Sequence, residues 1–104
     1  MPREPGLAVE ATGDGRFALS GVLDMVTNET FDDHLDAFTQ GRGAVTLDLA
    51  GITFLDSTGV RAIVGLAQRL GERGLVLRGA QENVHRTLVI ASIDGRRGIR
   101  IERG

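Results

Sequence analysis

The sequence from Val45 to Val60 reads VTLDLAGITFLDSTGV and contains the change of pattern that decides the fold. Its first half is almost wholly apolar, as expected for a central strand of a parallel sheet. Its last residues begin a helical pattern, so Ser57 is expected at the turn from strand to helix, directly after Asp56. Two interpretations of Ser57 follow: its hydroxyl caps the helix, or it accepts a phosphate from another protein.

The residues from Thr58 to Leu70 have the spacing of an amphipathic helix. One side of this helix is apolar and consists of Val60, Ile63, Val64, Ala67 and Leu70. The other side is small and basic and consists of Arg61, Gly65, Gln68 and Arg69. We expect the apolar side to pack on the sheet and the basic side to face solvent.

Two strands are expected near the start of the chain. Leu7–Ala11 alternates in polarity, and Arg16–Ser20 follows after the turn-forming residues 12–15. Gly21–Asp24 then carries the chain out of the second strand into a loop. The sequence alone leaves open whether these two strands pair with each other.

A second amphipathic helix is predicted from Asn28 to Gln40, with Phe31, Leu35 and Phe38 on its inner side. Its outer side is acidic and consists of Glu29, Asp32, Asp33 and Asp36. This acidic side is either a solvated helix face, which exposed helices need in any case, or a docking surface for a basic partner.

The remaining elements complete an alternation of strands and helices. Leu75–Arg78 is a short buried strand, and Glu82–Ala91 is a third helix with Val84, Leu88 and Ala91 inward. A polar loop, 92–98, precedes a last strand in which Ile99 and Ile101 share a face. The order predicts a single α/β domain over residues 7–104, with a mixed sheet of four to five strands covered by three to four helices. Residues 1–6 are expected to be a flexible lead.

Composition excludes several classes of function. The chain has 104 residues, a formal net charge of -2, 4 % aromatic residues and no Trp or Tyr, so nucleic acid is not an expected partner. It has no Cys, and its first residues lack the apolar core of a signal peptide. No apolar run reaches the roughly 18 residues of a membrane span. A cytoplasmic protein without direct membrane insertion is expected.

Catalytic motifs are absent from the sequence. The chain has no Lys for a phosphate-binding loop of the Walker type, and Leu55 occupies the first glycine position of G-x-S-x-G. His34 and His85 have no spacing tied to Ser57 and are not expected to bind metal. The segment Gly13–Ala18 matches a relaxed dinucleotide motif but lies between two strands, so we interpret it as a turn. We therefore expect no catalytic residue, no metal and no cofactor.

Ser57 remains to be explained. Serine before an apolar helical pattern is a favoured N-cap. Gly59, however, costs about 1 kcal/mol relative to Ala inside a helix, and a residue without a side chain allows another protein to approach the hydroxyl closely. Val60 also stands where a capping box would place Glu or Gln. These details favour a role beyond capping, so we expect Ser57 to cap the helix and to have a second function as well.

The segment Asp56–Val60, preceded by Val45–Leu49 and Gly51–Leu55, resembles the phosphorylation-site signature of bacterial anti-sigma factor antagonists, which belong to the STAS domain family. Gly21–Asp24 resembles that family's turn after the second strand, and the order of elements fits from Leu7 to Ile101. One departure is Gly79-Ala80-Gln81, where the family often has an Asn-Pro type of loop.

The resemblance implies a partner switch. The unphosphorylated domain would bind an anti-sigma factor that is also a serine kinase and thereby free a sigma factor. Phosphorylation of Ser57 would release the partner, and a serine phosphatase would reset the switch. The protein would then be a substrate and a ligand, not an enzyme, because ATP, Mg²⁺ and the catalytic base belong to the kinase.

The resemblance also implies roles for the residues around Ser57. Neighbours that shape the phosphorylation site would be Asp24, Asp56, Thr58 and Gly59. Separately from the resemblance, we expect the edge of the partner-binding surface to include Val60, Arg61, Gln68 and Arg69.

Two alternatives stay open at this point. Within the same fold, the chain would be a scaffold or regulatory subunit of a larger signalling or transport assembly, in which Ser57 or Thr58 is phosphorylated. From a different class, it would be a nucleotide-binding enzyme.

Overall fold

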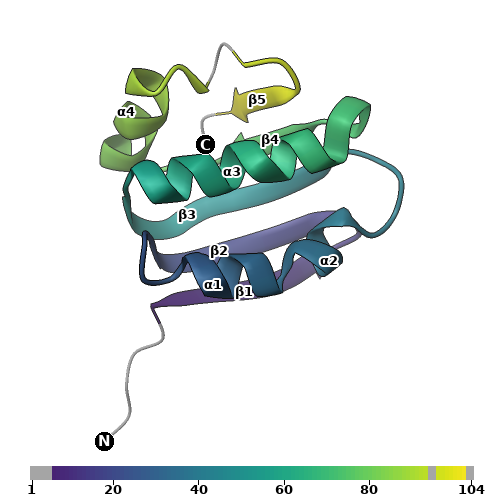
Figure 1. Ribbon diagram of the computed structural model, residues 1–104, viewed down its shortest axis with the longest axis horizontal. Helices are drawn as coiled ribbons and strands as arrows, with labels where there is room; N and C mark the ends of the chain where they lie inside the picture. Colours follow the sequence, from purple (N-terminus) through teal and green to yellow (C-terminus); the bar gives the residue numbers. More distant parts are fainter. Residues whose placement is uncertain (1–5, 94–95, 103–104) are drawn as a thin grey trace, which may run out of the picture.

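The strands of this protein form one sheet, and the helices alternate with them along the chain (Figure 1). The computed structural model describes residues 6–93 and 96–102. The elements in these residues are β1 (Leu7–Gly13), β2 (Arg16–Leu23), α1 (Asn28–Asp33), α2 (Leu35–Thr39), β3 (Val45–Leu55), α3 (Ser57–Leu70), the 3₁₀ turn η1 (Gly71–Arg73), β4 (Leu75–Arg78), α4 (Glu82–Ile90) and β5 (Ile99–Glu102). Apart from Gly6, the lead expected over residues 1–6 lies outside the described residues.

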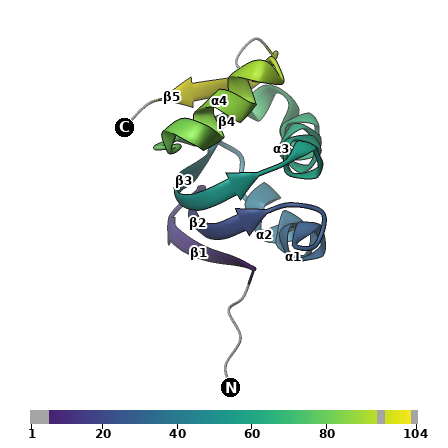
Figure 2. The same ribbon diagram turned by 90° about the vertical axis from the view of Figure 1, so that its left-hand side faces the viewer.

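The sheet has the order β1-β2-β3-β4-β5. β1 and β2 are antiparallel, while β2, β3, β4 and β5 run parallel to one another. Figure 2 shows α1, α2 and α3 together on one side of this sheet. The mixed α/β fold expected from the sequence is confirmed, and the two N-terminal strands do pair.

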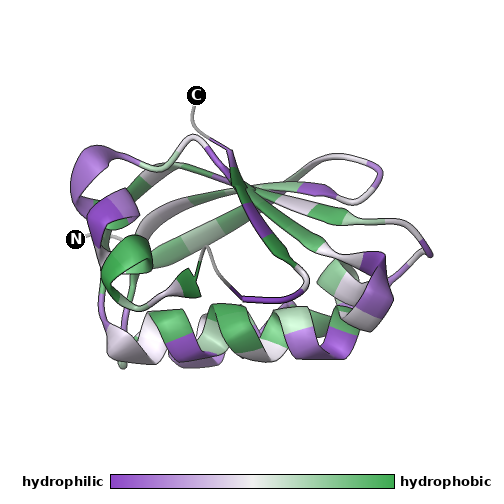
Figure 3. Ribbon diagram, turned by 90° about the horizontal axis from the view of Figure 1, so that it is seen from above, coloured by the Kyte–Doolittle hydropathy of each residue, from purple (hydrophilic) through white to green (hydrophobic). Residues whose placement is uncertain are grey.

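The core lies between the sheet and these helices. β3 contributes Val45, Leu47 and Leu49, which are buried, while Thr46 between them is half-buried on the other face. In Figure 3, hydrophobic and hydrophilic residues alternate along α3, the long helix at the lower side of the view. Period two in the strand and period 3.6 in the helix therefore place both apolar faces against each other.

The helix expected from Asn28 to Gln40 is two helices, and the boundary is His34. The Nδ1 atom of His34 lies 2.9 Å from the carbonyl oxygen of Thr30. In a continuous helix this carbonyl would accept the backbone N–H of His34, but here it contacts the His34 ring. The backbone N–H of His34 donates instead to the carbonyl of Phe31, at 3.0 Å. The prediction of one helix was wrong, but the four acidic residues on its outer side are exposed as expected.

Several element ends also differ from the prediction. β2 continues to Leu23 because it pairs with β3 along its whole length. Leu66 is fully buried although it lies outside the predicted apolar stripe of α3, and Ile93 is buried in the loop expected to be polar. Ala91, expected to face inward, is exposed just after the end of α4.

Candidate functional site

The carboxyl ends of β2 and β3 meet at one edge of the sheet. Leu23 pairs with Leu55, and the backbone N–H of Asp56 donates to the carbonyl of Leu23 at 3.3 Å. Figure 2 shows the two strand ends next to each other, where the chain turns into α1 and α3. The loop that begins at Asp24 and the turn that contains Ser57 are therefore neighbours.

Asp56, and not Ser57, caps α3. Asp56 has an extended backbone (φ -110°, ψ -173°), and its Oδ1 atom accepts a hydrogen bond from the N–H of Gly59 at 3.0 Å. Ser57 already has helical backbone as the first residue of α3. The prediction that Ser57 is the N-cap was therefore wrong. Both residue types are good caps, and the strand pairing at Leu55 decides that the carboxylate takes the role.

This arrangement leaves the Ser57 hydroxyl available. Ser57 is exposed, and no hydrogen bond joins its side chain to another described residue. The first turn of α3 also supplies backbone N–H groups and the positive end of the helix dipole, which favour an anion there. The Asp56 cap thus holds the serine at an accessible position without using its oxygen.

We expect Asp56→Ala to lower the free energy of unfolding by about 1 kcal/mol, because the N–H of Gly59 then loses its acceptor. Asp56→Asn keeps an acceptor oxygen and should remain within about 0.5 kcal/mol of the wild type. Urea unfolding followed by circular dichroism measures both. Equal stability of the wild type and Asp56→Ala would show that the carboxylate does not cap α3.

Gly59 is buried at the third position of α3. A Cβ atom there would clash with the carbonyl oxygen of Leu23 and would lie 2.6 Å from Cδ1 of Leu55. The sequence suggested that Gly59 gives another protein room to approach Ser57. In the structure the close approach is made by the chain's own β2 and β3.

Asp24 shapes the neighbouring loop. Its Oδ1 atom accepts hydrogen bonds from the backbone N–H groups of Val26 and Thr27, both at 3.0 Å. Thr27, which is only 5 % exposed, donates from its hydroxyl to the carbonyl of Val22 at 3.0 Å. Asp24 therefore forms an Asx-type turn, and among the described residues no hydrogen bond joins it to Ser57.

The side chains expected at the partner's edge divide into two groups. Arg61, Gln68 and Arg69 are exposed on α3, as the sequence predicted. Val60 is half-buried and packs against the core. Thr58, which was expected as a neighbour of the phosphorylation site, is also half-buried.

Sequence reasoning missed two residues at this edge. Met25 and Val26, at the tip of the Asp24 loop, are 73 % and 83 % exposed. An apolar pair inside a polar loop was the available signal, but the sequence does not show whether such a pair is buried.

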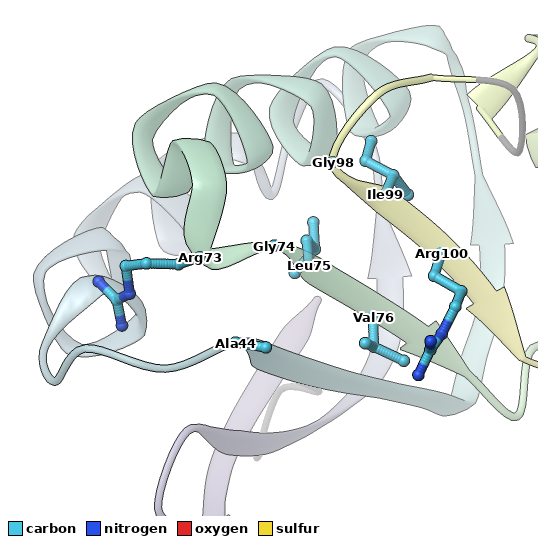
Figure 4. Close-up of a pocket in the computed structure, with 8 residues that line it drawn as sticks. All are labelled: Ala44, Arg73, Gly74, Leu75, Val76, Gly98, Ile99 and Arg100. Carbon is cyan, nitrogen blue, oxygen red and sulfur yellow. The ribbon is translucent and has the colours of Figure 1, made fainter.

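A hollow lies away from Ser57, at the amino-terminal ends of β3, β4 and β5 (Figure 4). Its lining is mostly apolar or glycine and consists of Ala44, Arg73, Gly74, Leu75, Val76, Gly98, Ile99 and Arg100. Arg73 donates to the carbonyls of Thr39, Gln40 and Gly43, and Arg100 pairs with Glu102 at 3.0 Å. Both charged groups are thus engaged, and none of the described residues in the lining is an acid or a histidine that would act as a base.

No metal-binding cluster of His, Cys, Asp and Glu occurs within residues 6–93 and 96–102. In the same part of the chain, none of the helices has the length and apolar character needed to cross a membrane.

Comparisons with known proteins place this geometry in context. The family model described as "Mlab, STAS domain" matches residues 7–101, which include every candidate site residue. Among solved structures, the chain is similar to an anti-sigma factor antagonist from Mycobacterium paratuberculosis, with a TM-score of 0.74 and 23 % sequence identity. The similarity covers 90 % of this chain and 85 % of that chain and, at this identity, shows the fold. No match was found among curated proteins.

Proposed function

The chain belongs to the STAS domain family, and we propose that it acts as an anti-sigma factor antagonist whose partner binding is controlled by a phosphate on Ser57. In this proposal the unphosphorylated protein binds an anti-sigma factor that is also a serine kinase, and a sigma factor is released. The phosphorylated protein dissociates from the anti-sigma factor. A serine phosphatase removes the phosphate and restores binding.

The observation that carries the proposal is the hydroxyl of Ser57, which is exposed beside the Asp56 cap and forms no hydrogen bond within residues 6–93 and 96–102. A serine that capped the helix would have to give up its hydrogen bond before it reacted. Here the carboxylate of Asp56 caps the helix, so a kinase can phosphorylate Ser57 without breaking a hydrogen bond of α3.

The chemical step of phosphorylation uses no group of this chain other than the Ser57 hydroxyl. The Ser57 oxygen attacks the γ-phosphorus of ATP, the bond to the β-phosphate oxygen breaks, and ADP leaves. The serine proton goes to a base of the kinase, which also holds ATP and Mg²⁺. The protein is accordingly proposed to be a substrate and a ligand, without catalytic activity or a cofactor of its own.

The effect of the phosphate is expected at the interface and not in the fold. The group adds about -1.5 to -2 charge. The first turn of α3 stabilises this charge, whereas the carboxylate of Asp56 opposes it, and these effects largely offset each other. Inside a desolvated interface the same charge has no such compensation, so the complex dissociates.

The proposed contact surface surrounds Ser57. Arg61, Gln68 and Arg69 form its exposed edge on α3, with Val60 contributing the part of its side chain that the core leaves open. Asp24, Thr58 and Gly59 are proposed to keep the loops around the serine in the shape that the kinase accepts.

A release assay tests this function. The protein is added to each complex of a sigma factor and an anti-sigma factor kinase encoded in its own genome, which we propose to be bacterial, and the free sigma factor is measured by size-exclusion chromatography. Release by the unphosphorylated protein from at least one complex is expected. Failure to release any sigma factor would contradict the proposed function.

A second candidate is a scaffold or regulatory subunit of a larger signalling or transport assembly. The family model that matches residues 7–101 is described as "Mlab, STAS domain", and this description fits the second candidate as well as the first. Affinity purification of the protein from its own cells distinguishes the two. Co-purification of a membrane permease would support the second candidate, whereas an anti-sigma factor would support the first, in which the protein is cytoplasmic.

A further inference from the structure

Met25 and Val26 form the most exposed apolar pair beside Ser57. They are 73 % and 83 % exposed, although burial in a protein interface would be strongly favourable for both side chains. They lie in the loop between β2 and α1, directly after the strand end that contacts Asp56. The pair therefore belongs to the same edge of the molecule as the proposed phosphorylation site.

This loop is held in place. The carboxylate of Asp24 accepts hydrogen bonds from the backbone N–H groups of Val26 and Thr27. The buried hydroxyl of Thr27 donates a hydrogen bond to the carbonyl of Val22 in β2. Side chains on an ordered loop lose less conformational freedom on binding than those on a disordered loop. The structure thus presents Met25 and Val26 to solvent on a preorganised turn.

The surface next to the pair is acidic. α1 begins two residues after Val26, and Glu29, Asp32 and Asp33 are exposed on it. None of these three acids forms an ion pair with another described residue. A binding partner that covers the pair would therefore gain from basic side chains around the contact.

We propose that Met25 and Val26 are the apolar anchor of the complex and insert into an apolar pocket of the anti-sigma factor whose rim is basic on the side that faces α1. This inference rests on the proposed function and adds the chemistry of the partner's surface. Arg61 and Arg69, which lie exposed on α3, then face a different part of the partner. The opposite charges of the two helices fix the orientation in which the partner docks.

The test uses the anti-sigma factor that responds in the release assay and measures the dissociation constant by isothermal titration calorimetry. Met25→Ser/Val26→Ser is expected to raise the dissociation constant about 30-fold or more. Ile90→Ser is the matched control, because Ile90 is 76 % exposed but lies on α4. The dissociation constant of this variant for the anti-sigma factor should stay within about twofold of the wild-type value. Thermal unfolding should show that both variants remain folded.

The charge of the pocket rim is tested separately. Asp32→Lys is expected to raise the dissociation constant several-fold at low salt, with a smaller effect at high salt. Asp14→Lys, in the exposed turn between β1 and β2 at the opposite end of β2 from the Asp24 loop, makes the same change of charge away from the site and should have little effect.

Three outcomes would overturn the inference. If Met25→Ser/Val26→Ser binds with wild-type affinity and Ser57→Asp loses binding, Met25 and Val26 are not the anchor, but the proposed function still holds. Failure of the wild type to bind any anti-sigma factor would remove both. The third outcome is a wild type that sediments as a dimer and a double variant that sediments as a monomer. Met25 and Val26 would then bind a second copy of this chain and not the anti-sigma factor.

Discussion

Gly59→Ala is expected to lower the free energy of unfolding by about 2–3 kcal/mol, the largest stability effect predicted for a single methyl group in this chain. The added Cβ atom would overlap the carbonyl oxygen of Leu23 and the side chain of Leu55. Neither neighbour can move freely, because Leu23 and Leu55 are paired in the sheet and buried in the core. The start of α3 would have to move away from the ends of β2 and β3.

Gly65→Ala is the matched control in the same helix. A Cβ atom at this position would meet nothing within 4 Å, so the substitution should stabilise the protein by about 0.5–1 kcal/mol through helix propensity alone. Urea unfolding of both variants gives the comparison. Equal stability of Gly59→Ala and the wild type would show that α3 does not begin against the carbonyl of Leu23.

Ser57→Asp is expected to weaken binding to the anti-sigma factor by about 100-fold, which corresponds to roughly 2.7 kcal/mol. The added carboxylate would stand beside Asp56 at the start of α3, where the proposed interface with the partner would exclude water. Ser57→Ala removes only a hydroxyl that has no partner among the described residues, so it should bind within about threefold of the wild type. Titration calorimetry with all three proteins measures the difference.

Ser92→Asp controls for the added charge. Ser92 is exposed after α4 and has a positive φ of 61°, a conformation that Asp tolerates. This variant should bind like the wild type. If Ser57→Asp and Ser92→Asp weaken the complex equally, net charge and not position controls binding, and Ser57 loses its special role.

The sequence was sufficient for the central unit of the fold. The apolar run of β3 and the apolar stripe of α3 have different periods, and each period predicts its own element and the face that packs. The boundaries were less predictable. The break at His34 depends on a contact between its ring and the Thr30 carbonyl, which the helical spacing of Phe31 and Phe38 does not reveal.

The site was predictable in part. Its position at the strand-to-helix turn followed from the pattern, and the exposure of Arg61, Gln68 and Arg69 agrees with the prediction. The identity of the cap was not predictable, because Asp56 and Ser57 are both good caps and the backbone of Asp56 decides between them. The reason for Gly59 lies in β2, far away in sequence, so no local pattern contains it.

The central claim is that Ser57 is the phosphoacceptor of a partner switch. It is tested most directly by incubating the protein with ATP, Mg²⁺ and the anti-sigma factor kinase that responds in the release assay, and by locating the phosphate with mass spectrometry. We predict a single phosphate on Ser57 and none on Ser57→Ala. A phosphate on Thr58 or elsewhere in the wild type, or no phosphate at all, would contradict the claim.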